Sequence, residues 1–235
     1  MSPPSPWYLT PTTYACVPRD QAIFFDAPHG RYLALTASET ASLTGHIVGW
    51  PTVERTVSPS VEPSLAATTL LRLANGRLIT TDGTSGKPVE PPRHDPATRS
   101  LPTFSLQRDF LRQLKFLPLF VWSLLQTPPA DNLLAIVERT RRRRRDLRAP
   151  LSLVSLTRLV TAHCYLRPLF YSAHDACLED SLRLMEFLAA HRIDTTLVIG
   201  VRNRPFGAHA WLEISDYVLN DEASRVHQFT PLVII

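Results

Sequence analysis

The hydrophobic pattern of the first third of the chain predicts a small domain of strands and helices. Two apolar blocks, 22–25 and 32–35, flank a segment whose Pro28 and Gly30 favour a turn, so we expect a β-hairpin. The spacing of Thr36 and Glu39 matches a capping box, which predicts a helix over 37–48. A second helix over 66–74 and a strand over 77–81 complete a domain at 1–83.

The pattern changes twice after this domain. Residues 82–103 are rich in Gly, Pro, Ser, Thr and charge, so we expect a linker, placed at 84–104, that contributes to no core. Beyond it, residues 105–235 form a second domain. The periodicity predicts helices over 106–125, 132–145, 151–165 and 175–191, and strands over 195–201, 208–214 and 217–220. The predicted class is α+β, with a helix bundle packed on an antiparallel sheet.

Composition restricts the class of protein. Hydrophobic residues make up 44% and charged residues 20% of the 235 residues, as in soluble globular proteins. The three cysteines, Cys16, Cys164 and Cys177, cannot build a disulfide framework, and no secretory signal opens the chain. We therefore expect a cytoplasmic protein. The most apolar stretch, 116–125, is shorter than the ~20 residues that span a bilayer, so we expect no membrane insertion.

The basic run Arg141 to Arg145 could face solvent on a helix or hold an anionic partner. No zinc finger or RNA-binding aromatic motif accompanies it, so we expect no nucleic-acid partner. There is no Cys-x-x-Cys and no histidine pair at helical ligand spacing. We therefore expect no metal and no cofactor.

Cys177, His209 and Asp221 are the candidates for catalysis. A thiol nucleophile needs a base that takes its proton and a third group that orients the base, and the chain supplies these residue types in that order. A cysteine near a helix start has a lowered pKa. Because Glu179 and Asp180 oppose this effect, His209 has to supply most of the activation.

The spacing of His209 and Asp221 makes a structural demand. A three-residue loop at 214–216 would place the two residues opposite each other on one face of a hairpin. A two-residue loop at 215–216 would place them on opposite faces. A catalytic triad therefore predicts an odd loop or a bulge.

Each candidate residue also has an ordinary structural interpretation. A single cysteine is usually a small buried hydrophobe, and an aspartate after a strand is usually a turn residue. Cys164 beside His163 is a competing nucleophile, but neighbours on a helix point about 100° apart, so we interpret this pair as structural.

Four motifs carry a resemblance to a known family: ACLEDSL at 176–182, VIGV at 198–201, PFGAHAWLE at 205–213 and VLND at 218–221. At these positions the chain resembles the lasso peptide maturation B proteins, which are transglutaminase-like cysteine leader peptidases. The resemblance implies a papain/transglutaminase-like fold for 105–235. It also implies that Cys177 is the nucleophile, His209 the base and Asp221 the orienting acid.

The first 83 residues are similar, more weakly, to the PqqD-like precursor-recognition element, a small winged-helix domain. Such a domain implies that the leader of a precursor peptide binds here. An edge strand at 31–35 could accept the leader as a further strand, with the helix over 66–74 as an apolar wall. The candidate leader-binding residues are Arg31, Tyr32, Leu33, Ala34, Leu35, Leu70, Leu71 and Leu73.

The resemblance implies that the chain removes the leader of a ribosomal precursor peptide and passes the core to an asparagine-synthetase-like lasso cyclase. Two other functions stay open. The same residues could catalyse acyl transfer to an amine, as in transglutaminases and arylamine acetyltransferases. The chain could also be a non-catalytic adaptor that delivers the precursor to another enzyme.

Overall fold

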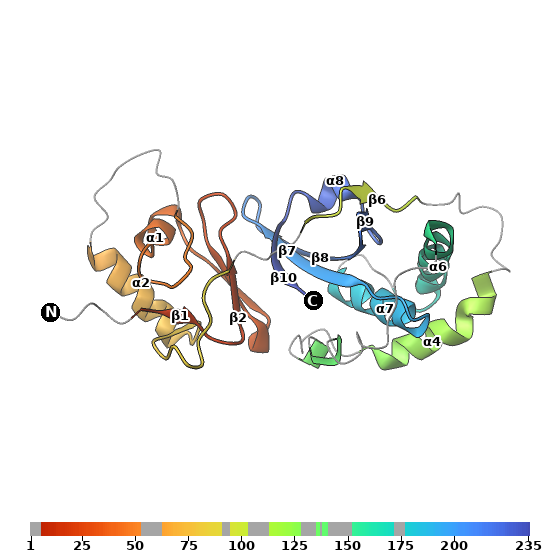
Figure 1. Cartoon of the computed structure of the whole chain (residues 1–235), viewed down its shortest axis with the longest axis horizontal. Coiled ribbons are helices and arrows are strands. Elements are labelled where there is room, and N and C mark those ends of the chain that lie inside the picture. Colours follow the sequence, from red (N-terminus) through yellow and green to blue (C-terminus); the bar gives the residue numbers. More distant parts are fainter. Residues whose placement is uncertain are drawn as a thin grey trace. The chain divides into compact units, whose positions relative to one another are not determined.

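The computed structural model describes residues 6–52, 63–90, 95–102, 113–127, 135–136, 138–140, 152–171 and 177–235. Its contacts divide the chain into two compact units. The first comprises residues 1–93 with 201–207, and the second comprises residues 94–200 with 208–235. Figure 1 labels many of their helices and strands, and each unit is described by itself.

A three-stranded antiparallel sheet forms the base of the first unit. Its order is β2 (Thr13–Cys16), β3 (Ile23–Asp26) and β4 (Arg31–Ala34), so β4 lies at the edge. The predicted hairpin is β3 and β4. The turn between them is a short 3-10 helix, η1 (Ala27–His29), and Gly30 follows it at φ 62°, a left-handed conformation that glycine adopts without strain.

Two helices and a second, two-stranded sheet complete the first unit. α1 (Ala37–Ser42) begins with the predicted capping box, in which Thr36 and Glu39 bond each other's backbone N–H groups. The prediction that this helix reaches residue 48 is wrong, because turns follow Ser42. After α2 (Pro63–Asn75), β5 (Ile79–Thr80) pairs antiparallel with β1 (Tyr8–Leu9). The winged-helix, PqqD-like assignment stays a prediction.

The second unit combines a five-stranded sheet with helices. The sheet order is β10 (Thr230–Ile234), β7 (Thr196–Arg202), β8 (Gly207–Ile214), β9 (Tyr217–Val218) and β6 (Arg99–Ser100). β8 and β9 are antiparallel, but β6 runs parallel to β9, so the sheet is not wholly antiparallel as predicted. A short helix, α8 (Ala223–Val226), follows β9.

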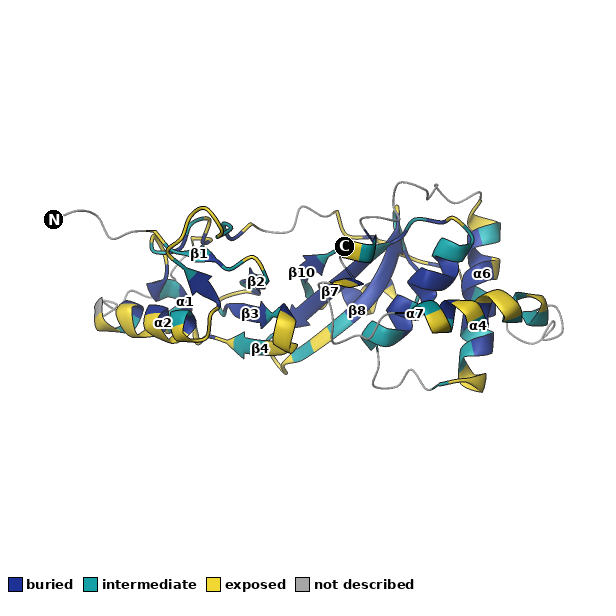
Figure 2. Cartoon of the chain, turned by 90° about the horizontal axis from the view of Figure 1, so that it is seen from below, coloured by how far each residue is buried: buried dark blue, intermediate teal, exposed yellow. Residues whose placement is uncertain are grey.

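Three helices of the second unit pack on one another: α4 (Leu117–Gln126), α6 (Leu153–Leu166) and α7 (Cys177–Ala190). A 3-10 turn, η2 (Leu114–Phe116), precedes α4. Figure 2 shows β7 buried along most of its length, β8 buried except at its exposed first end, and α7 buried along much of its length. Of the predicted helix over 132–145, the described residues 135–136 and 138–140 are helical. The run Arg141 to Arg145 lies outside the described residues.

The expected linker takes part in both units. Val89 is buried in the core of the first unit, and its N–H donates to the carbonyl of Val48. Ala97 belongs to a core cluster of the second unit, and β6 extends the sheet there. The prediction that residues 84–104 contribute to no core is therefore wrong. Backbone hydrogen bonds and small apolar side chains are enough to dock this segment.

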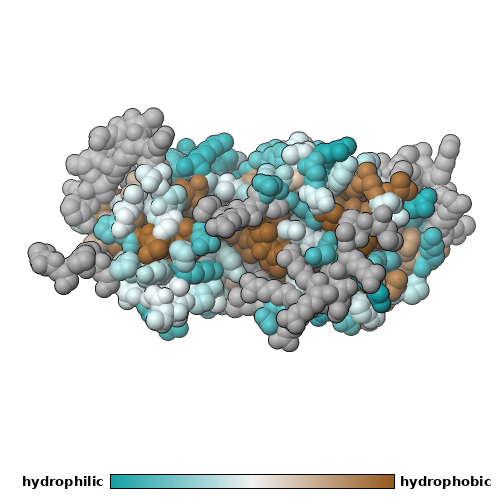
Figure 3. Space-filling view, in the orientation of Figure 1, coloured by the Kyte–Doolittle hydropathy of each residue, from teal (hydrophilic) through white to brown (hydrophobic). Residues whose placement is uncertain are grey.

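In the part of the chain that the structure describes, no helix has the length and apolar character needed to cross a bilayer. The face drawn in Figure 3 carries hydrophobic residues in separate patches among hydrophilic ones.

Candidate active site

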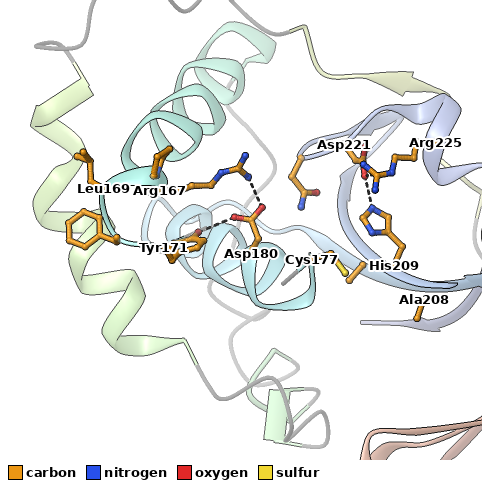
Figure 4. A pocket seen from close by; sticks show the side chains of 13 residues that line it. Arg167, Leu169, Tyr171, Cys177, Asp180, Ala208, His209, Asp221 and Arg225 are labelled. Atoms are coloured by element: carbon orange, nitrogen blue, oxygen red, sulfur yellow. Dashed lines mark hydrogen bonds and ion pairs between the residues drawn. The ribbon is translucent and has the colours of Figure 1, made fainter. Parts of the chain in front are cut away.

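Cys177 is the first residue of α7, and its half-buried side chain opens into a cavity of about 1050 Å³ in the second unit. Figure 4 shows the cysteine beside His209, with Asp180, Arg167 and Tyr171 along the wall away from that pair. The cavity lining consists of Arg167, Pro168, Leu169, Phe170, Tyr171, Cys177, Asp180, Ala208, His209, Ala210, Asn220, Asp221 and Arg225. The 167–171 part of this wall was missed from the sequence, because no motif marks it.

The structure brings the three candidate catalytic residues together. His209 lies on β8, and its Nε2 is 2.5 Å from Oδ2 of Asp221. The imidazole is also hydrogen-bonded to the thiol of Cys177. Because Nε2 faces the carboxylate, Nδ1 is the ring nitrogen available to the sulfur. The thiol, the imidazole and the carboxylate therefore form one hydrogen-bonded row at the end of the cavity.

Two aromatic rings pack against the imidazole. The ring of His209 lies 6.0 Å from that of Trp211 and 5.3 Å from that of Phe229, centroid to centroid. Gly200 on β7 leaves room for the indole, since a Cβ there would lie 2.7 Å from the Trp211 ring. Packing thus restricts the rotation of His209, which favours one orientation toward the thiol.

The register between β8 and β9 differs from the one that the triad was expected to require. Glu213 pairs with Val218 and Ile214 with Tyr217, so the turn has two residues, and Ser215 adopts φ 51°. The prediction of an odd loop or bulge is wrong. His209 and Asp221 still meet, because regular pairing ends before residue 221 and the loop carries the carboxylate round to the imidazole.

The electrostatics of the site favour a thiolate and an imidazolium. Burial raises the pKa of Cys177, but hydrogen bonds from His209 and from the N–H groups of Ala210 and Leu178 outweigh it, so the pKa lies below its ordinary value. Burial lowers the pKa of His209, but Asp221 and Cys177 outweigh it and raise the pKa to about 9. Both pKa shifts lie in the direction that favours transfer of the proton from the thiol to the imidazole.

The acidic neighbours of Cys177 are each paired with an arginine. Asp180 accepts from Nη1 of Arg167 at 2.9 Å, and Glu179 accepts from Nη2 of Arg183 at 2.9 Å. These cations offset the two negative charges. The expectation that Glu179 and Asp180 oppose thiolate formation therefore ignored their partners, which lie 4 to 13 positions away along the chain.

The competing pair Cys164 and His163 has the opposite electrostatic character. His163 is buried among aromatic rings, and this burial lowers its pKa to about 3. Burial likewise raises the pKa of the Cys164 thiol. The described residues also contain no group of three or more His, Cys, Asp and Glu side chains that could hold a metal ion.

The predicted leader-binding residues divide into two groups. Arg31, Tyr32, Leu33 and Ala34 form the edge strand β4. Leu71 is 61% exposed on α2, whereas the remaining three residues are core positions. The side chains of these three residues are each at most 7% exposed, and their part in leader binding stays a prediction: Leu35, Leu70 and Leu73.

Comparison with known proteins gives two partial matches. Residues 120–234 match the sequence model of the transglutaminase-like superfamily, so they form a transglutaminase-like domain. A 45-residue stretch is 47% identical to the microcin J25-processing protein McjB of Escherichia coli. This stretch is 19% of the chain, and it spans only 22% of the length of McjB. No solved structure matches the chain.

Proposed function

We propose that this chain is a cysteine peptidase that removes the leader from a ribosomally made precursor of the lasso peptide type. The observation that carries the proposal is the continuous row of Cys177, His209 and Asp221 at the end of the cavity. The similarity to a peptide-processing protein and the transglutaminase-like domain support it. In this reading Cys177 is the nucleophile, His209 the acid and base, and Asp221 the residue that orients the imidazole.

The proposed reaction has two halves. The thiolate of Cys177 attacks the carbonyl carbon of the scissile bond, and the His209 imidazolium gives its proton to the leaving amine. The C–N bond breaks, so the core peptide leaves and the leader stays as a thioester. Water then attacks the thioester while His209 takes a proton, and the C–S bond breaks to release the leader acid and restore the ion pair.

Binding of the leader to the first unit is the second part of the proposal. A triad contacts few atoms of its substrate, so choosing one precursor requires contacts remote from the scissile bond. The edge strand β4 offers backbone groups that a leader could pair with as a further strand. The exposed Leu71 is the α2 side chain, among those predicted, that is available to such a partner.

The released core would then pass to an asparagine-synthetase-like cyclase in the cytoplasm. The motifs that resemble the lasso maturation B proteins support this step. A pull-down of the purified cyclase by the full chain, with and without the precursor, tests it.

Incubation of the full chain with candidate precursors, followed by mass spectrometry, tests the reaction class. A peptidase gives a leader with a free carboxylate and an intact core, even when a primary amine such as glycine methyl ester is added in excess. A leader that carries the added amine would instead establish acyl transfer. Binding of the precursor without any cleavage would favour the adaptor function.

A further inference from the structure

Ser181 lies one helical turn after Cys177, on the same helix, and its side chain is completely buried. Its hydroxyl donates to the carbonyl of Ala210 at 3.0 Å. The same hydroxyl accepts from Nδ2 of Asn220 at 2.9 Å. Ser181 therefore joins α7 to β8 and to the loop that follows β9.

Asn220 continues this chain of hydrogen bonds. Its Oδ1 accepts from the N–H of Leu212 at 2.9 Å, while the N–H of Leu219 still donates to the Leu212 carbonyl. The amide side chain thus takes the place of a backbone carbonyl where the pairing of the two strands ends. Because Asn220 bonds Leu212 through its side chain, the backbone is free to leave the strand pairing after Leu219, just before Asp221.

The chain of hydrogen bonds reaches all three segments that carry the triad. Ser181 is on the helix of Cys177, Ala210 follows His209 directly, and Asn220 precedes Asp221 directly. Both backbone groups of Ala210 bond residues of α7: its N–H donates to the Cys177 sulfur, and its carbonyl accepts from the Ser181 hydroxyl.

We propose that Ser181 and Asn220 are positioning residues that fix the helix of Cys177, the strand of His209 and the loop of Asp221 in one arrangement. The inference rests on the proposed role of the triad. Removing the Ser181 hydroxyl leaves the Ala210 carbonyl and the Asn220 amide without that partner, so the two segments can separate from α7. The Ala210 N–H then no longer points reliably at the sulfur, and the thiolate loses a donor.

The test compares Ser181→Ala with Ser123→Ala, a matched control. Ser123 is also a fully buried helical serine of the second unit, but its hydroxyl donates to Phe120 of its own helix, α4. For each full-length variant, circular dichroism monitors folding. The rate of Cys177 alkylation by iodoacetamide is measured against pH by peptide mass spectrometry, which reports the thiolate without any substrate.

Ser181→Ala should shift the midpoint of alkylation to higher pH by about one pKa unit, which slows alkylation about tenfold at pH values below both midpoints. Ser123→Ala should leave the midpoint unchanged, and Ser181→Thr should restore it because threonine keeps the hydroxyl. Asn220→Ala should shift the midpoint in the same direction. In the double variant the midpoint should shift no further than in the more strongly affected single variant, since both residues belong to one chain of hydrogen bonds.

An unchanged midpoint in folded Ser181→Ala would overturn the inference, and if that variant does not fold, an unchanged midpoint in Asn220→Ala would do so. The failure of the proposed function looks different. If no precursor is cleaved but the midpoint shifts, positioning of the thiol stands and the peptidase assignment fails. If precursor is cleaved and neither variant shifts the midpoint, the peptidase assignment stands and the positioning role of Ser181 and Asn220 fails.

Discussion

His209 and Asp221 are hydrogen-bonded at 2.5 Å although the register of their hairpin does not place them opposite each other. The contact exists because the loop leaves the ladder one position before the carboxylate. A pair formed in this way depends on the loop, and it has a chemical consequence, because the carboxylate raises the pKa of His209.

Replacing Asp221 by Asn should therefore lower the pKa of His209 from about 9. Since the imidazolium must protonate the leaving amine, the alkaline limb of the cleavage profile should move to lower pH, and the rate at pH 8 should fall by at least about tenfold. Glu222→Gln, which neutralises the next residue, serves as the control. If the alkaline limb does not move in Asp221→Asn, the Asp221 carboxylate does not control the pKa at which His209 acts.

The wild-type chain should show a bell-shaped cleavage profile and a different alkylation profile. Cleavage should rise as the thiolate forms, at a pH below the ordinary thiol value, and should fall as His209 deprotonates near pH 9. Alkylation needs only the thiolate, so it should reach a plateau and show no fall near pH 9. The acidic and alkaline limbs of the cleavage profile report the coupled titration of Cys177 and His209 as a pair. Parallel alkaline losses in both assays would contradict the ion-pair account.

Arg167→Gln should raise the midpoint of Cys177 alkylation and slow alkylation at pH values below that midpoint by roughly threefold to tenfold. The change removes the cation that offsets Asp180, and an uncompensated carboxylate on the same cavity wall raises the pKa of a thiol. Arg158→Gln makes the same change of charge on an exposed part of α6 and should have no effect. Equal rates in the two folded variants would show that the ion pair does not influence the thiol.

The leader-binding proposal is tested best at Ala34. Leu35 donates its N–H to the carbonyl of Ala22, and antiparallel pairs alternate, so the N–H of Leu33 also points toward β3. The N–H of Ala34 therefore points to the outer edge of β4. Proline at this position removes that donor, whereas Leu33→Pro would break the sheet itself.

Ala34→Pro in the full chain should weaken the binding of a fluorescent leader peptide by about tenfold or more, and Ala34→Val, which keeps the N–H, should not. Circular dichroism checks that both variants fold. If Ala34→Pro is folded and binds as tightly as the wild type, the leader does not add to this edge.

The sequence predicted those helices whose formation depends on residues close together along the chain. The capping box at Thr36 and the apolar face of α7 each depend on residues within a few positions, and both are present as predicted. Elements that form through distant pairing were missed, among them β1, β6 and β10, because a two-residue strand or a terminal strand shows little periodicity of its own.

The site was predictable in its residue types and order but not in its details. The hairpin analysis failed because it assumed that pairing continues to Asp221, whereas the Asn220 side chain ends it. The arginine partner of Glu179 lies at i+4 on the same helix, a spacing that could have been noticed, but Arg167, the partner of Asp180, belongs to another element and could not be found from spacing. The end of the hairpin pairing and the Asp180–Arg167 pair both depend on tertiary hydrogen bonds, which leave no periodic pattern in the sequence.

The most direct test of the central claim is the cleavage rate of a precursor by Cys177→Ala compared with Cys164→Ala, measured by mass spectrometry of the leader and core. Cys177→Ala should form neither fragment while its dissociation constant for the precursor is unchanged, because the thiol does the chemistry. Cys164→Ala should cleave at close to the wild-type rate. Removal of a nucleophile typically costs several orders of magnitude, so cleavage by Cys177→Ala at more than about a tenth of the wild-type rate would contradict the account.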